Sequence, residues 1–582
     1  MLSQTSRIRI GRPLALAFGA ALLLAGATTM AVRAASDGGS QGPSACPGDN
    51  GGLTLSPGFC ATVFADNLGH VRHLIVAPNG VVYANIWSGS YYPGSPKPQD
   101  GFLVALQPAK GGDQAGVITH FGETVAQGAK GGTGVALYRG MIYAEANDRI
   151  VRYRLAPGEV VPKGPPEVVV SGLPTTGDHN MHPFVISPTG QLFVDVGSAT
   201  NSCQPKNRQP NIPGAVPCVE KETRAGIWLY DANRLGQTFS AKERFVSGLR
   251  NGEGLAWDAE GRLFATQHGR DQLIQNWPSL YPDVQHTVEL PAEELVRLKA
   301  GADYGWPECY YDNFQKKLVL APEYGGDGGK AVGVCAQRTP PVAAFPAHWA
   351  PNDMTIYNAR AFPAPYRGGA LIAFHGSWNR GPAAQDGYNV VFQPLRDGRP
   401  SGAFVVFADG FAGARKDPGH ADHRPMGLAV GPDGALYIAD DVKGRIWRVT
   451  YQGDPNITAI AGAPAPVTSL PAAPTLAARP LPTPPGSSPE QVAAGDRLFH
   501  ANACASCHGT DAKGTPLAPD LTSGTWLWGD GGLASITDII AKGVPQPKRY
   551  RSPMPPMGGA QLSQADLAAV SAYVWAVGHQ GK

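Results

Sequence analysis

The sequence is poor in charged residues and has no excess of either sign. Lys, Arg, Asp and Glu make up 16% of the 582 residues, and the formal net charge is +2. A balanced composition of this kind gives no indication of a nucleic-acid partner, which would require a basic surface. Beyond the N-terminus no apolar run is long enough to span a bilayer, so we expect no transmembrane segment in the processed chain.

The N-terminus has the pattern of a secretory signal. Arginines at positions 7, 9 and 12 precede an apolar run over residues 14–27, and Val32-Arg33-Ala34 has the small-x-small form of a cleavage site. We therefore predict a signal peptide over residues 1–34. An uncleaved anchor is the alternative, although the run is short for a membrane span. The arginines are not adjacent, which favours export of the unfolded chain.

A second pattern lies near the C-terminus, where residues 503–509 read Ala-Cys-Ala-Ser-Cys-His-Gly. This is the C-x-x-C-H signature of covalent haem attachment. Cys504 and Cys507 would bond the two haem vinyl groups, and His508 would be the proximal iron ligand. A redox dithiol or half of a zinc site is the alternative. A thioether downstream supports the haem interpretation, because Met554 and Met557 lie beside a Pro-Pro pair.

This C-terminal stretch resembles class I cytochrome c. The resemblance covers residues 489–582 and implies a small all-α domain with one covalent haem c. It implies that Met554, the methionine before the Pro-Pro pair, is the distal ligand, with Met557 as the alternative. His/Met ligation fills both axial positions and suits electron transfer.

The remaining six cysteines fall into three pairs that are close in sequence. The proximity of the residues suggests disulfides between Cys46 and Cys60, Cys203 and Cys218, and Cys309 and Cys335. Six cysteines allow fifteen connectivities, so proximity is the sole basis for this pairing. Free or metal-bound thiols are the alternative. Disulfides and covalent haem together predict a periplasmic location.

Between residues 46 and 452 a strand–turn–strand pattern recurs at long, uneven intervals. Apolar residues lead into a turn containing glycine, and an alternating strand follows. The copies span residues 74–84, 135–144, 185–194, 255–265, 366–373 and 428–439. Repetition of this kind predicts an all-β six-bladed propeller, with seven blades as the alternative. A linker rich in proline and alanine, residues 453–488, would join it to the cytochrome domain.

Polar loops adjoin these hairpins and would converge at one end of the propeller. Four of their motifs resemble the sorbosone/pyranose dehydrogenase propellers, relatives of the soluble glucose dehydrogenases that use pyrroloquinoline quinone (PQQ). The motifs are LRNGEGLA at 249–256, GADYGWP at 301–307, HGSWNR at 375–380 and RPMG at 424–427. The resemblance covers roughly residues 53–450.

The resemblance implies roles for individual residues. Arg250, Arg380 and Arg424 match positions that would bind the PQQ carboxylates, with Arg72 as a fourth candidate. Asn251 would hydrogen-bond the quinone side of the cofactor. His179 aligns with the catalytic histidine that takes the proton of the substrate hydroxyl, and His182 is the runner-up.

Calcium is expected beside PQQ in this family. Matching the loop suggests Gly269 and Arg270 as carbonyl ligands, with Asp271 as a carboxylate ligand. The sequence departs from the glucose enzymes in this loop and after His179, which leaves the ligand set and the substrate open.

The sequence therefore predicts a periplasmic dehydrogenase. A sugar or related alcohol or aldehyde would be oxidised with PQQ, and the electrons would pass through haem c to another periplasmic carrier or the respiratory chain. The alternatives are PQQ-free propellers carrying a cytochrome: a lactonase-like hydrolase, or a scaffold that binds a partner. The arginines in the loops favour the dehydrogenase, because a tricarboxylate needs them and a scaffold does not.

Overall fold

The computed structural model describes residues 46–89, 96–380, 383–464 and 481–580, except for residues 502, 510, 515–517, 551–553, 555, 560 and 561. The predicted signal peptide, residues 1–34, and residues 465–480 of the predicted linker lie outside this set. Among the described residues, none of the helices combines the length and the apolar character that a membrane span requires.

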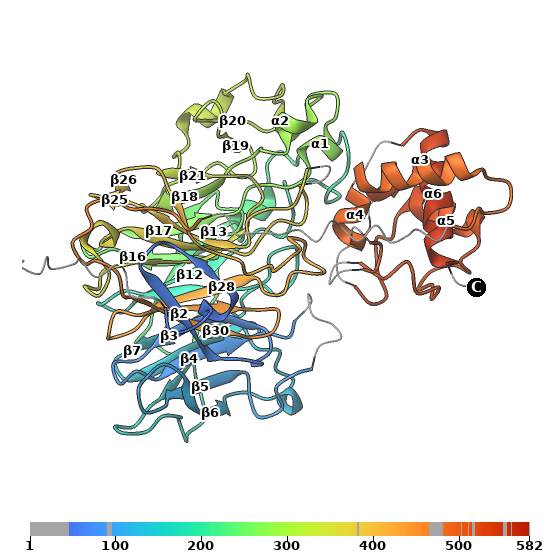
Figure 1. Cartoon of the computed structure of the whole chain (residues 1–582). Coiled ribbons are helices and arrows are strands. Elements are labelled where there is room, and N and C mark those ends of the chain that lie inside the picture. Colours follow the sequence, from blue (N-terminus) through green and yellow to red (C-terminus); the bar gives the residue numbers. More distant parts are fainter. Residues whose placement is uncertain are drawn as a thin grey trace, which may run out of the picture. The chain divides into compact units, whose positions relative to one another are not determined.

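Six antiparallel sheets follow one another along the chain and form the blades of a propeller (Figure 1). Blade 1 consists of β3 (Val71–Val76), β4 (Val82–Ile86), β5 (Leu103–Pro108) and β6 (Ala115–Phe121). Blade 2 consists of β7 (Val135–Tyr138), β8 (Met141–Ala146), β9 (Arg149–Arg154) and β10 (Glu167–Ser171), extended by β14 (Gln237–Thr238). Blade 3 consists of β11 (Phe184–Ile186), β12 (Gln191–Val196), β13 (Gly226–Asp231) and β15 (Arg244–Ser247).

The other three blades have the same plan. Blade 4 consists of β16 (Leu255–Trp257), β17 (Leu263–Gln267), β18 (Glu293–Arg297) and β21 (Ala343–Phe345). Blade 5 consists of β22 (Pro351–Ile356), β23 (Ala370–Phe374), β24 (Asn389–Gln393) and β27 (Val405–Asp409), extended by β1 (Thr54–Leu55). Blade 6 consists of β28 (Pro425–Val430), β29 (Leu436–Asp440), β30 (Ile446–Tyr451) and the N-terminal strand β2 (Phe59–Ala65).

The first strands of the blades close a ring. β3 contacts β7, and the series continues through β11, β16, β22 and β28 back to β3. The N-terminal β2 pairs with β30 along blade 6, so one blade is shared by the two ends of the propeller sequence. The prediction of six blades is confirmed, and the seven-bladed alternative is wrong.

The recurring hairpins of the sequence are the inner strands of the blades. In blade 1 the turn between β3 and β4 is held by the Gly80 amide, which donates to the carbonyl of Ala77 at 2.8 Å. Gly80 has φ +83°, a conformation that side chains bearing Cβ rarely adopt. Five of the predicted copies place a tight turn between the two strands nearest the propeller axis. In blade 5, residues 357–369 separate β22 from β23, and the predicted copy covers the end of this loop and most of β23.

One apolar cluster lies between each pair of neighbouring blades. Blades 5 and 6, for example, share a cluster around Phe392 and Trp447, and blades 2 and 3 share one around Tyr143 and Trp228. Each sheet buries both faces against its neighbours, which explains why a blade is not stable alone and the ring must close.

The three predicted disulfides are confirmed. Cys46–Cys60, Cys203–Cys218 and Cys309–Cys335 are bonded, and the two cysteines outside these disulfides are those of the predicted haem signature, Cys504 and Cys507. Blade 4 carries two insertions: α1 (Leu273–Asn276) and α2 (Val284–Thr287) lie between β17 and β18, and the hairpin of β19 (Cys309–Asp312) and β20 (Lys317–Leu320) lies between β18 and β21. The third disulfide ties the second of these insertions. A short hairpin in blade 5 consists of β25 (Leu395–Arg396) and β26 (Arg399–Pro400).

The C-terminal region is helical. Its helices are α3 (Pro489–Ala501), α4 (Ala503–His508), α5 (Leu533–Lys542) and α6 (Gln564–Gly578). Helices α3 and α6 cross closely at Gly495, where a Cβ would lie 1.9 Å from the carbonyl oxygen of Ala569. A capping box starts α6, because the Ser563 hydroxyl accepts from the Asp566 amide at 3.1 Å and Asp566 accepts from the Ser563 amide at 3.3 Å.

Candidate functional site

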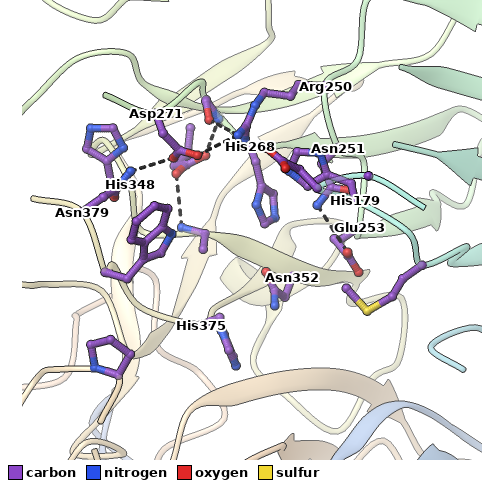
Figure 2. Close-up of a pocket in the computed structure, with 18 of the residues that line it drawn as sticks. His179, Arg250, Asn251, Glu253, His268, Asp271, His348, Asn352, His375 and Asn379 are labelled. Atoms are coloured by element: carbon purple, nitrogen blue, oxygen red, sulfur yellow. Dashed lines mark hydrogen bonds and ion pairs between the residues drawn. The ribbon is translucent and has the colours of Figure 1, made fainter. Parts of the chain in front are cut away.

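Loops from several blades enclose a cavity of about 580 Å³ (Figure 2). This volume is typical of sites for small molecules and cofactors. Its ionisable lining residues are Arg72, Asp178, His179, Arg208, Arg250, Glu253, His268, Asp271, Glu293, His348, His375 and Arg424. Of the predicted site residues, Asn251 and Gly269 also line the cavity.

His179 is held with one ring nitrogen against the protein. Its Nδ1 lies 2.9 Å from the carbonyl oxygen of Ser198 and 3.0 Å from the Ser198 hydroxyl. The carbonyl can only accept, so Nδ1 carries the proton and Nε2 keeps its lone pair for the cavity. Burial and the positive charge of Arg250 lower the pKa of His179 to about 3, so the ring is neutral near pH 7. A neutral imidazole with a free nitrogen is equipped to accept a proton.

The runner-up, His182, lies outside the cavity lining. It is buried, and its Nδ1 lies 3.1 Å from Glu145 while its Nε2 lies 3.0 Å from the carbonyl of Pro174. Both ring nitrogens are therefore used inside the protein, which makes His179 the better placed base of the two.

Arg250 belongs to a buried network around Asp271. Its guanidinium donates to Asp271 at 2.7 Å, to the carbonyl of Gly269 at 2.9 Å and to the side chain of Asn201 at 3.0 Å. Asp271 also accepts from Arg208 at 2.9 Å and from Asn379 at 2.6 Å. Burial opposes ionisation of Asp271, but the two guanidinium groups hold its pKa well below the usual range.

The other predicted arginines differ in where they point. Arg72 and Arg424 line the cavity; Arg72 pairs with Asp441 at 2.7 Å, and Arg424 donates to the carbonyls of His375 and Gly376 at 2.9 and 2.8 Å. Arg380 does not line it, because its guanidinium is paired with Glu289 and the carbonyl of Ala347.

The cavity contains further neutral histidines. Burial lowers the pKa of His268 to about 3 and the pKa of His348 and His375 to about 4. Burial also raises the pKa of Glu293 to about 8, although this carboxyl accepts from the amides of Gly269 and Ala350. The net positive charge of the lining therefore resides on arginines.

The lining residues fit the anionic, planar group that the family resemblance implies. Arg424 uses Nε and Nη2 on carbonyls, which leaves Nη1 for a ligand. The buried oxygens Oδ1 of Asn251 and Oδ1 of Asn352 have no hydrogen-bond partner among the described residues. A ligand whose carboxylates accept from a guanidinium and whose ring N–H donates to one of these oxygens would suit the site, and PQQ has both kinds of group.

The predicted calcium ligands fit a cation poorly. The carbonyl of Gly269 and the carboxylate of Asp271 already accept from the guanidinium of Arg250, which would repel a dication. Arg270, whose carbonyl is the other predicted ligand, is not among the residues that line the cavity. Within the described ranges, no group of three or more His, Cys, Asp or Glu side chains is placed to hold a metal ion. We therefore derive no step from calcium.

Sequence reasoning missed two residues that line the cavity from the segment closed by Cys203–Cys218. Arg208 donates to Asp178 at 2.9 Å and Asn207 donates to the same carboxylate at 3.0 Å. Neither belongs to a motif. The short spacing of Cys203 and Cys218 was the one available signal for these two residues. It indicated a loop closed by a disulfide, but it did not indicate that the loop lies at the cavity.

Three of the predicted haem residues line a second, largely apolar cavity of about 130 Å³, and Cys507 is not among its lining residues. Cys504, His508 and Met554 line it, together with the apolar side chains of Phe499, Trp526, Ile536, Ile540, Val570 and Val574. Met557 is not among its lining residues and has φ +54°.

Hydrogen bonds hold the two predicted axial ligands of the haem in place. The Nδ1 of His508 lies 2.9 Å from the carbonyl of Pro519, which leaves Nε2 for iron. The backbone of Met554 pairs with Val544 in both directions, at 2.7 and 3.0 Å. Because Met554 lines the cavity and Met557 does not, Met554 is the better placed of the two candidates for the distal ligand.

Comparison with known proteins agrees with both cavities. A pyrroloquinoline quinone-dependent pyranose dehydrogenase from Coprinopsis cinerea is 26% identical over 267 residues, covering 40% of this chain and 35% of that protein. A Cbb3-type cytochrome c oxidase subunit FixP from Rhizobium etli is 38% identical over 87 residues, covering 14% of this chain and 29% of that protein. The chain thus covers half or less of the length of each of these relatives.

Solved structures and family comparisons complete the assignment. An AA12-family carbohydrate-active enzyme from Trichoderma reesei superposes with a TM-score of 0.54 and 18% identity, covering 69% of this chain and 98% of that one, which shows a shared fold. The TrAA12-like family matches residues 103–452 and the cytochrome c family matches residues 492–578. The chain therefore belongs to the TrAA12-like family and carries a C-terminal cytochrome c domain.

Proposed function

We propose that the chain is a periplasmic quinohaemoprotein dehydrogenase that oxidises a sugar or a related alcohol or aldehyde. The observation that carries the proposal is the neutral His179, whose free Nε2 belongs to a cavity lined by arginines. The relative that uses PQQ and the shared propeller fold support the choice of cofactor. The three disulfides and the haem-attachment signature support the oxidising compartment.

The residues of the cavity have distinct tasks in this proposal. PQQ, when bound, supplies an ortho-quinone that accepts a hydride. Nε2 of His179 would take the hydroxyl proton of the substrate while the carbon-bound hydrogen leaves as hydride, so the substrate loses two electrons and two protons in all. Arg424, with Arg72, would hold the cofactor carboxylates. Asp271 keeps Arg250 in place and neutralises part of its charge.

The electrons then leave through the C-terminal domain. Cys504 and Cys507 would anchor haem c, and His508 and Met554 would hold its iron from the two sides. With both axial positions filled by these residues, the haem would supply transfer of one electron at a time and would leave no position open for a substrate. A periplasmic carrier or the respiratory chain would receive them.

The proposal is tested with the haem as its own reporter. The full chain is purified with haem, supplied with PQQ and mixed with aldoses, sorbosone and simple alcohols while the absorbance of reduced haem is followed. We expect reduction that requires both PQQ and one class of substrate, and a loss of about 100-fold or more in His179→Gln. Reduction of the haem that is independent of PQQ, or a hydrolase activity without electron release, would refute the dehydrogenase.

A further inference from the structure

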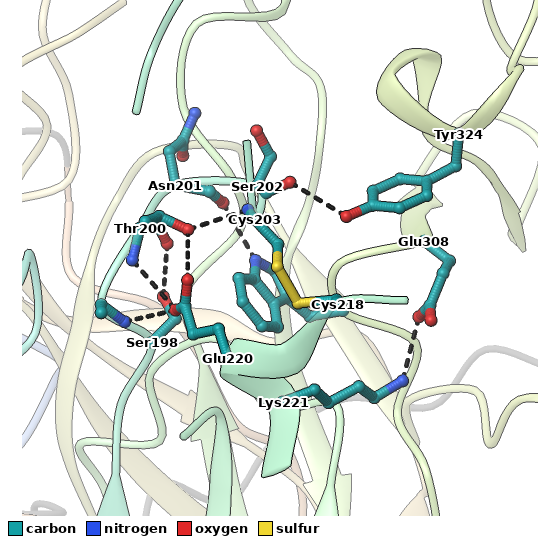
Figure 3. Close-up of a disulfide and its surroundings, with 12 residues drawn as sticks. Ser198, Thr200, Asn201, Ser202, Cys203, Cys218, Glu220, Lys221, Glu308 and Tyr324 are labelled. Atoms are coloured by element: carbon teal, nitrogen blue, oxygen red, sulfur yellow. Dashed lines mark hydrogen bonds and ion pairs between the residues drawn. A yellow bond between two sulfur atoms is a disulfide. The ribbon is translucent and has the colours of Figure 1, made fainter. Parts of the chain in front are cut away.

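The segment between β12 and β13 lies against the proposed base. The two strands pair up to Val196 and Gly226, and residues 197–225 form a loop insertion between them. Cys203–Cys218 closes most of this insertion, and a short 3₁₀ helix, Val219–Glu222, follows the second cysteine directly. Figure 3 shows Glu220 pointing from this helix toward Ser198 and Thr200.

Glu220 accepts three hydrogen bonds from the start of the insertion. One carboxylate oxygen accepts from the amide of Ala199 at 2.5 Å and from the amide of Thr200 at 3.0 Å. The other accepts from the hydroxyl of Thr200 at 2.7 Å. That hydroxyl in turn accepts from the amide of Cys203 at 2.8 Å. Glu220 thereby fixes the backbone that immediately follows Ser198 and connects it to the disulfide.

The backbone that Glu220 fixes holds the base. Ser198 supplies both partners of His179 Nδ1, and its hydroxyl donates to the carbonyl of Thr200 at 2.7 Å. The amide of His179 also donates to the carbonyl of Ser198 at 3.2 Å. A displacement of residues 198–200 would therefore move the ring of His179 and change the solvation of its free nitrogen.

The same loop also holds Arg250. The amide of Ser198 donates to the carbonyl of Arg250 at 2.7 Å, and the side chain and carbonyl of Asn201 accept from its guanidinium at 3.0 and 3.3 Å. Another part of the insertion binds Asp178, the residue that precedes His179, because Arg208 and Asn207 both donate to its carboxylate.

We propose that Glu220 is a positioning residue for His179, and that the disulfide Cys203–Cys218 anchors it there. The inference rests on the proposed role of His179 as the base. Glu220 itself does not line the cavity, so it acts through Thr200 and Ser198 and makes no contact with substrate or cofactor.

The first test replaces Glu220 in the PQQ-loaded full chain. Glu220→Ala removes all three acceptor contacts, and we expect kcat to fall by about 100-fold, as for a displaced catalytic group, with a smaller change in KM. Glu220→Gln keeps one oxygen for the two amides and loses the acceptor for the Thr200 hydroxyl, so it should recover most of the activity. Thr200→Ser, which keeps the hydroxyl, should behave like the unmodified protein.

Two measurements distinguish a loss of His179 positioning from a general loss of folded protein. In Glu220→Ala, we expect the acid limb of kcat/KM to move away from its position below pH 4, because burial, the charge of Arg250 and the contact with Ser198 set the pKa of His179 and all three depend on where its ring lies. Independently of turnover, titration of the PQQ-free chain with PQQ should show weaker binding, because Arg250 lines the cavity as one of the residues expected to bind PQQ and loses part of its support.

The disulfides provide a matched pair of variants. Cys203–Cys218 spans 15 positions and Cys46–Cys60 spans 14, so removing either one frees a loop of similar length. We expect the Cys203→Ser/Cys218→Ser variant to reproduce the shift of the acid limb, and the Cys46→Ser/Cys60→Ser variant to keep the unmodified profile. Equal pH profiles in these two variants would contradict the anchoring role.

The outcomes distinguish this inference from the proposed function. If His179→Gln retains substrate-driven haem reduction, the proposed base is wrong and the inference fails with it. If His179→Gln is inactive while Glu220→Ala keeps the unmodified kcat and pH profile, the proposed function stands and the positioning role of Glu220 is refuted. A Glu220→Ala chain that loses activity with an unchanged acid limb also refutes it.

Discussion

The haem cavity and the propeller cavity differ in how far apart in sequence their residues lie and in how much charge they bury. The predicted haem ligands come from residues 504–554, and their surroundings are mostly apolar. The propeller cavity draws on residues from Arg72 to Arg424 and contains twelve ionisable side chains among its lining residues. One site is local and apolar, and the other is distributed and charged.

The difference follows from what each cavity has to hold. Haem is a large apolar disc whose iron needs two ligands, which a helix and one following loop can supply. A buried set of charges is stable only when every charge finds a partner, so the propeller must bring acids and arginines together from different blades. Asp271, for example, joins Arg250, Arg208 and Asn379, which come from three separate loops.

The largest expected effect comes from separating the two cavities. In Cys504→Ser/Cys507→Ser both thioether bonds are lost, so we expect no covalent haem and a complete loss of electron delivery to haem-dependent acceptors. Oxidation of the proposed substrate, measured with an artificial dye that takes electrons from the propeller, should persist, because the lining of the propeller cavity contains neither cysteine. Loss of the dye-coupled activity as well would show that the two cavities do not function independently.

The contrast explains how much the sequence could predict. The haem site was predictable because its signature is contiguous, and Met554 follows within the same domain. The blades were predictable because each inner hairpin repeats a turn with glycine, as at Gly80. Arg208 and Glu220 were not predictable, because folding of a disulfide-closed insertion brings them to His179 and no local pattern records it.

Arg380 illustrates the opposite failure. Its motif matches the family, yet its guanidinium is paired with Glu289 and the carbonyl of Ala347, and it does not line the cavity. A sequence motif identifies the residue type at a position, whereas the acceptors that compete for its side chain come from other segments. The role of Arg380 in binding PQQ therefore stays a prediction.

The next largest effect is expected at the buried charge network. Asp271→Asn leaves Arg250 and Arg208 without their shared carboxylate, and we expect the free energy of unfolding to fall by about 3–5 kcal/mol. The pKa of Asp271 is lower in the folded protein, so its contribution is present above the unfolded pKa of about 3.9 and is lost as the pH falls through the folded pKa. Urea unfolding should therefore show a constant difference between pH 5 and 8.

An exposed ion pair serves as the control for this change. Lys443 and Asp422 lie 3.2 Å apart with side chains 48% and 61% exposed, and Asp422→Asn should alter the free energy of unfolding by less than about 1 kcal/mol. Similar losses in the two variants would contradict the view that the propeller cavity depends on paired buried charge.

The smallest expected effect tests the local character of the cytochrome domain. Ser563→Ala removes the hydroxyl that accepts from the Asp566 amide at the start of α6, and we expect this domain alone to lose about 1 kcal/mol. Urea unfolding followed by haem absorbance measures it, while the propeller transition should not move. Gln564→Ala, at the neighbouring exposed position, should change the domain by less than about 0.5 kcal/mol. The capping box spans four consecutive positions, so its loss should affect the cytochrome domain alone. An effect of Ser563→Ala on the propeller transition would mean that the two domains unfold as one unit. The contrast between a local and a distributed site would then concern the geometry of the two sites and not their stability.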